Sequence, residues 1–201
     1  MEQPVEPQRD SGPTETNFVQ LGLLFYAALA VAGGVWRIGF YDEPILFTSV
    51  AAQAEELSLW RDLLLGVAAA AALIALSDWA TLKTRWGEDL ARAMARALGP
   101  LSVSNAVLLA LVSGFAEEVF FRGALQPRVG WLLASLLFGC VHFVPRREFL
   151  PWTGFAIGAG FLFGALFVWT GNLLAPVTAH VVVNGVNLPR LVRRYGPAEP
   201  T

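Results

Sequence analysis

Residues 103–126, VSNAVLLALVSGFAEEVFFRGALQ, form a long apolar stretch that contains Glu117, Glu118 and Arg122 near its end. A helix that spans a bilayer needs about 20 mainly apolar residues, and this stretch is long enough for one. An ionisable side chain inside a span costs about 2.5–3.5 kcal/mol on insertion scales and is a functional candidate by default. The stretch therefore predicts a membrane helix that carries part of a functional site.

The composition indicates a membrane protein over most of the chain. The 201 residues are 55% hydrophobic and only 15% charged, with a mean hydropathy of +0.54, whereas soluble domains carry about a quarter charged residues. We predict an all-α polytopic membrane protein, a bundle of about six transmembrane helices with one or two interfacial amphipathic helices. The six candidate spans are residues 18–36, 62–80, 103–126, 130–145, 152–170 and 173–189.

The segments outside these spans are polar. Residues 1–17 hold four acids and three prolines, a composition that cannot bury enough apolar surface to fold, so we predict a disordered tail. Residues 18–102 are expected to contain two transmembrane helices with interfacial segments. Within them, residues 81–100 alternate apolar and basic side chains at helical spacing, which is typical of a helix lying in the headgroup plane. A simple basic loop is the alternative.

The distribution of basic residues predicts the orientation. With six spans, ten of the fourteen lysines and arginines fall on one side of the membrane, and cytoplasmic loops carry that excess. We therefore expect an integral, multi-pass protein of a prokaryotic plasma membrane with both termini cytoplasmic and a basic cytoplasmic tail at 190–201. The formal net charge of −2 gives no sign of a nucleic-acid partner.

A small set of polar side chains falls inside the predicted spans: Glu117, Glu118, Arg122, His142, His180 and Asn184. Residues four apart on a helix share a face. Glu118 and Arg122 therefore predict an ion pair, whose simplest role is architectural, and Glu117 points elsewhere. His180 and Asn184 share a face by the same spacing.

Depth can be counted from the predicted turns. With turns near Arg128 and Gly171, a rise of 1.5 Å per residue puts Glu117 roughly 16 Å, His142 roughly 21 Å, His180 roughly 13 Å and Asn184 roughly 19 Å from its turn. All four then lie in one layer near the middle of the membrane. Glu117 with His142 would make a general base for water, and His180 with Asn184 could donate to an oxyanion. Two histidines and a glutamate are also the ligand set of a catalytic zinc site, and the spacing does not distinguish a zinc site from a glutamate–histidine base.

The motifs resemble those of the CPBP family of intramembrane proteases, the type II CAAX prenyl endopeptidases and their prokaryotic relatives. Three motifs occur in the family's order: EEVFFR at 117–122, FGCVH at 138–142 and HVVVN at 180–184. The resemblance implies that residues 103–189 form the catalytic helical core. It also implies that Glu117 activates water with help from His142, that His180 and Asn184 hold the oxyanion, and that three further residues support the site, namely Glu118, Arg122 and Phe138.

The resemblance also shapes the expected partners. We expect an endopeptidase acting near the C-terminus of a membrane protein or peptide, one that is lipid-modified or carries a C-terminal sorting signal. We expect no cofactor; the alternative is Zn²⁺ held by Glu117, His142 and His180. Oligomerisation is left open. Two other functions compete: a non-proteolytic immunity or scaffold protein, and a proton-coupled transporter, since glutamate and histidine at mid-membrane also serve proton relays.

Overall fold

The computed structural model describes residues 15–196 and is built from helices. The helices are α1 (Glu15–Gly34), α2 (Val50–Ala54), α3 (Leu59–Lys83), α4 (Arg85–Leu98), α5 (Val103–Glu118), α6 (Gln126–Val129), α7 (Trp131–Val141), α8 (Leu150–Thr170) and α9 (Leu174–Tyr195). π-Helical turns continue α1 and α5, and a 3₁₀ turn precedes α8. Within this range the one β pairing is an isolated bridge between Phe47 and Asn172. The all-α prediction is confirmed.

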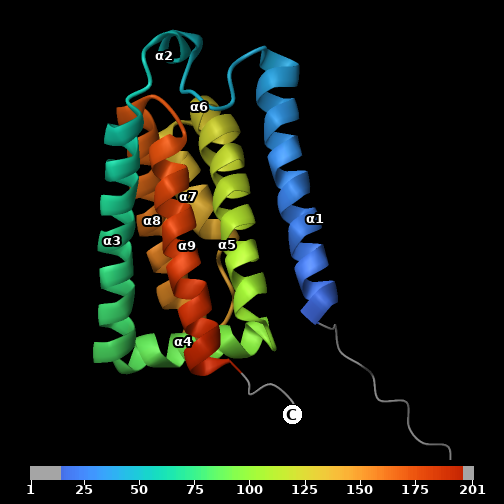
Figure 1. The fold of residues 1–201 in the computed structure, drawn as a ribbon, viewed down its shortest axis with the longest axis vertical. Coiled ribbons are helices and arrows are strands. Elements are labelled where there is room, and N and C mark those ends of the chain that lie inside the picture. The colour runs from blue at the N-terminus through green and yellow to red at the C-terminus, as the bar shows by residue number, and fades with distance from the viewer. Residues whose placement is uncertain (1–14, 197–201) are drawn as a thin grey trace, which may run out of the picture.

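The long helices stand side by side in a bundle (Figure 1). α9 packs against both α3 and α5, α7 packs against α8, and α1 packs on the outer side of α5. The short α2 lies at one end of the bundle, and α4 crosses the other end, where α1 begins and α9 ends.

Among the residues that the structure describes, four helices are long and apolar enough to cross a membrane: Glu15–Gly39, Leu59–Lys83, Val103–Val129 and Arg147–Thr170. The protein is therefore a membrane protein. Of the other two predicted spans, the one at 130–145 is an apolar helix of only 11 residues that ends at Val141. α9 has the length but is more polar, with Arg193 and Arg194 in its last turn. The count of about six spans remains a prediction.

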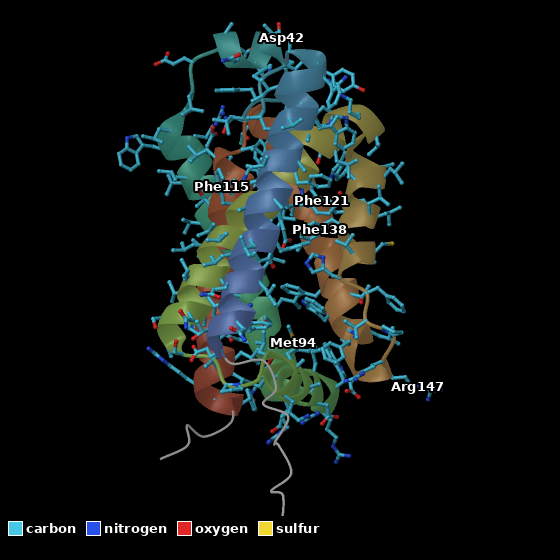
Figure 2. All side chains as sticks on the ribbon, turned by 90° about the vertical axis from the view of Figure 1, so that its right-hand side faces the viewer. Asp42, Met94, Phe115, Phe121, Phe138 and Arg147 are labelled. Carbon is cyan, nitrogen blue, oxygen red and sulfur yellow. The ribbon has the colours of Figure 1, made fainter. Side chains whose placement is uncertain are left out.

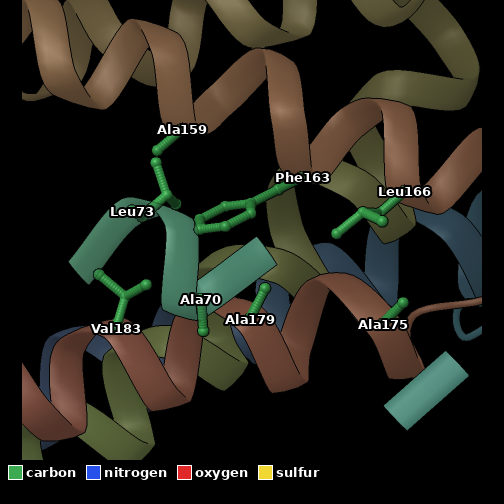
Figure 3. Packing of buried hydrophobic residues seen from close by; sticks show 8 residues of the cluster. All are labelled: Ala70, Leu73, Ala159, Phe163, Leu166, Ala175, Ala179 and Val183. Carbon is green, nitrogen blue, oxygen red and sulfur yellow. The ribbon is translucent and has the colours of Figure 1, made fainter. Parts of the chain in front are cut away.

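Small side chains allow the helices to approach closely at the centre of the bundle. One buried cluster joins α3, α8 and α9 (Figure 3), and its members are Ala70, Leu73, Ala159, Phe163, Leu166, Ala175, Ala179 and Val183. Between α7 and α8, a Cβ added at Gly164 would lie 2.5 Å from Trp131 Cδ1, whereas one added at Gly158 would meet nothing within 4 Å. Close packing thus joins α8 to α7 and to α9, the helices that carry the motif residues.

The predicted helix in residues 81–100 is present as α4. Thr84 caps its first turn by accepting a hydrogen bond from the Gly87 amide at 3.0 Å, and Gly99, with a φ of +67°, ends it. Its buried residues include Ala91, Ala93 and Ala95, whereas Trp86 is 48% exposed. The simple loop is thereby excluded, and the position of α4 in the headgroup plane stays a prediction.

Candidate active site

The first motif lies where α5 changes its winding. α5 ends at Glu118, and the next seven residues form a π-helical turn, a feature that often accompanies functional sites. Arg122 Nη1 donates to Glu118 Oε1 at 3.1 Å, and Arg122 Nη2 donates to the Gly160 carbonyl at 2.9 Å. The predicted ion pair is present. It is fully buried and also ties the α5 segment to α8.

Glu118 has a second partner that the spacing did not predict. Its Oε1 also lies 2.8 Å from His180 Nδ1 on α9. Because the Arg122 guanidinium stabilises Glu118 as a carboxylate, which can only accept, Nδ1 is the donor. Glu118 therefore fixes the orientation of the His180 ring. A helical wheel of α5 alone cannot show which glutamate a residue of α9 will meet.

His142 is oriented in a similar way by its own helix. It directly follows α7, and its Nδ1 lies 2.7 Å from the Phe138 carbonyl oxygen, which can only accept, so Nδ1 carries the proton. In the neutral ring, Nε2 then carries a lone pair and can accept a hydrogen bond. The Trp152 ring meets the imidazole edge to face, with centroids 5.2 Å apart.

Glu117 faces both imidazoles. Its Oε2 lies 3.6 Å from His142 Nε2 and 4.0 Å from His180 Nε2, longer than hydrogen bonds. The same oxygen is buried and has no hydrogen-bond partner. Polar atoms at this separation are commonly bridged by water. A water molecule beside the three atoms could donate hydrogen bonds to two of these acceptors, so the arrangement can hold and activate a water molecule.

Aromatic rings enclose the two histidines. The Phe138 ring lies 4.6 Å from His142 and 5.8 Å from His180, centroid to centroid, and the Arg122 guanidinium sits over its face at 4.3 Å. Phe163 stacks on His180 at 5.0 Å. Figure 2 places Phe138 beside Phe121 at mid-height of the bundle, between Asp42 near one end and Arg147 toward the other. Phe138 thus packs against both imidazoles and against Arg122 of the buried ion pair.

Asn184 lies slightly apart from this cluster. Its Nδ2 donates to the Ser113 hydroxyl at 3.2 Å, and Ser113 is one helical turn before Glu117 on α5. The structure therefore brings Glu117, Glu118, Arg122, His142 and His180 together and places Asn184 one turn away.

Tyr26 of α1 was not among the predicted site residues. Its hydroxyl interacts with both the Glu117 carboxylate and the Ser113 hydroxyl. The sequence held one signal for it, since Tyr26 is the only polar side chain between Leu21 and Gly34.

The residues that could hold a metal are Glu117, His142 and His180. An Nδ1 donating to a carbonyl or a carboxylate is also how metal-binding histidines are oriented. In the part of the chain that the structure describes, however, no group of three or more His, Cys, Asp or Glu side chains has the geometry to hold a metal ion.

Fold and site together define an integral membrane helical bundle with a buried glutamate–histidine site, and the comparisons with known proteins agree. Residues 99–186 match the family model described as "Type II CAAX prenyl endopeptidase Rce1-like". This match to an Rce1-like domain model confirms the resemblance seen in the motifs.

Among curated proteins, the chain is 40% identical over 87 residues to "Uncharacterized protein YpbD" of Bacillus subtilis (strain 168). The alignment covers 42% of this chain and 44% of that relative, so the likeness spans less than half of either protein. No solved structure matches the chain.

Proposed function

We propose that the protein is an intramembrane endopeptidase. It hydrolyses a peptide bond near the C-terminus of a membrane protein or peptide, with water activated by Glu117 and His142. The observation that carries the proposal is the Glu117 Oε2 atom, which is buried without a hydrogen-bond partner and faces the Nε2 atoms of two oriented histidines. The Rce1-like match over residues 99–186 supports it independently.

In this mechanism Glu117 and His142 take the proton of a water molecule as its oxygen attacks the scissile carbonyl carbon. Both groups are acceptors toward the water, because His142 already uses its Nδ1 proton to bond the Phe138 carbonyl. When the tetrahedral intermediate collapses, the C–N bond breaks and the same proton passes to the leaving nitrogen. No side-chain nucleophile is required.

The oxyanion of that intermediate is stabilised by His180 and Asn184. His180 can donate from Nε2 only when both ring nitrogens carry protons, and the Glu118 carboxylate at Nδ1 stabilises the positive ring. Asn184 lies one helical turn away. Its Nδ2 now donates to the Ser113 hydroxyl and would donate to the substrate oxygen instead.

The alternative mechanism uses a zinc ion. Glu117, His142 and His180 would hold the ion, which would supply a metal-activated water. The two mechanisms are separated by dialysis of the purified protein against a strong chelator. Glutamate–histidine catalysis predicts unchanged cleavage, and loss of cleavage with rescue by Zn²⁺ would favour the metal.

We further propose that both termini face the cytoplasm. The first described residue, the end of α9 and the basic helix α4 all lie at the same end of the bundle (Figure 1), and positive charge marks the cytoplasmic side.

The test of the function is a comparison of membrane proteomes from cells that express the wild-type protein or Glu117→Gln. C-terminal fragments present only with the wild type would identify the substrate and show whether it is lipid-modified or carries a sorting signal. Glu56→Gln makes the same chemical change at an exposed loop position and should behave as wild type. Identical fragments in all three samples would overturn the proposal.

A further inference from the structure

The helix α1 lies outside the segment at 99–186 that matches the Rce1-like model. Only 11% of its most apolar window is buried, so most of the helix faces lipid. Its packed side carries Val19, Gly22, Tyr26, Ala30 and Gly33, which follow one another at helical spacing. Tyr26 is thus on the face that meets α5.

Two glycines on this face bring the helices close together. A Cβ added at Gly22 would lie 2.9 Å from Leu109 Cδ2, and one added at Gly33 would lie 3.2 Å from the backbone Cα of Phe120. Tyr26 lies between the two contacts, four residues after Gly22 and seven before Gly33. Its side chain is therefore held against α5 at the level of the motif.

Polar contacts fix α1 at both ends. Glu15 Oε1 accepts from the Ser102 amide at 2.6 Å and from Asn105 Nδ2 at 2.7 Å, which joins the start of α1 to the start of α5. At the other end Arg37 is 3.2 Å from Glu43, which also pairs with Arg128. These anchors set the height of Tyr26 along the bundle.

We propose that Tyr26 is a positioning residue of the site, whose hydroxyl donates to the Glu117 carboxylate and keeps Oε2 directed at the two imidazoles. The hydroxyl interacts with Glu117 and with Ser113, and Ser113 in turn accepts from Asn184. Tyr26, which lies outside the matched segment, thus contacts Glu117, the proposed base. It also contacts Ser113, which accepts a hydrogen bond from the Asn184 amide that is proposed to stabilise the oxyanion. The assignment of a positioning role rests on the proposed function.

The first experiment measures peptide cleavage by purified Tyr26→Phe, which removes only the hydroxyl. Small misplacements of a catalytic group are costly, so kcat should fall by about 10-fold or more while KM stays within about twofold. Tyr41→Phe deletes a phenolic hydroxyl at the end of the helical segment that continues α1 and should leave both constants unchanged. An unchanged kcat, or a raised KM at constant kcat, would overturn the positioning role.

A second experiment does not depend on activity. Thermal unfolding is measured for wild type, Tyr26→Phe, Glu117→Leu and the double variant. If the hydroxyl bonds Glu117, Tyr26→Phe lowers the melting temperature by about 3–8 °C in the wild type and by much less in Glu117→Leu. Equal shifts in both backgrounds would refute the contact. A wild type that cleaves nothing would count against the proposed function, while this cycle would still decide whether the contact exists.

Discussion

Glu118 contacts both Arg122 and His180, so removing its carboxylate affects the buried ion pair and the orientation of the His180 ring together. The Glu118→Leu variant leaves the Arg122 guanidinium, which is 1% exposed, without its carboxylate. Breaking a buried ion pair from one side costs about 3–5 kcal/mol, which for a chain of this length is about 6–20 °C in melting temperature. His180 Nδ1 loses its acceptor in the same step. The single variant should be both unstable and inactive.

The double variant Glu118→Leu/Arg122→Met distinguishes the two roles. Replacing both partners of a buried pair by apolar groups is often close to neutral. Here the Gly160 carbonyl loses Arg122 but keeps the Ser135 hydroxyl at 3.0 Å. The melting temperature should therefore return most of the way to the wild-type value. Cleavage should stay at least about 100-fold below wild type, the usual cost of losing one oxyanion donor.

The assay is thermal unfolding in detergent, with cleavage measured on the same preparations. The control is Asp78→Asn, because Asp78 and Arg190 form an exposed pair at 2.9 Å and such pairs contribute less than about 1 kcal/mol. If the double variant regains both stability and cleavage, Glu118 only neutralises Arg122, and the argument that it orients His180 is wrong.

Three further predictions concern the scaffold. Gly164→Ala should lower the melting temperature by about 2–12 °C through overpacking against Trp131, whereas Gly158→Ala, which meets nothing within 4 Å, should change it little. Thr84→Ala removes the α4 cap and should cost about 1 kcal/mol, seen as less helical signal at a given denaturant concentration. The hydrogen bond from Arg128 holds the pKa of Glu43 below its usual range, so the stabilisation is present at neutral pH and lost as the pH falls through that lowered pKa. The difference in melting temperature between wild type and Glu43→Gln should therefore shrink on acidification, and a constant difference would contradict this.

Much of the site could be predicted because local spacing determines it. The contact between Glu118 and Arg122 follows from a separation of four residues, and counting along the helices placed His142 and His180 at the depth of Glu117. Asn184 was placed in the same layer, but it lies one turn away beside Ser113. The count assumes straight, upright helices and contains no information on tilt.

Contacts between helices distant in sequence could not be predicted. Nothing in α5 indicates that Glu118 accepts from His180 Nδ1 while Glu117 faces Nε2 of the same ring. Tyr26 reaches the site because glycines on α1 allow a close approach to α5. The span expected at 130–145 ends at Val141 because an apolar run does not mark where a helix ends. Pro145 was the available signal, since a residue before proline disfavours helical backbone.

The central claim is that Glu117 activates the water that cuts the peptide bond. The most direct measurement is the rate of cleavage by purified, reconstituted wild type and Glu117→Gln, on a substrate found in the membrane-proteome comparison. Glutamine keeps the size of the side chain but cannot accept the proton, so we predict a loss of at least about 100-fold with normal folding. Cleavage by Glu117→Gln at the wild-type rate would contradict the mechanism.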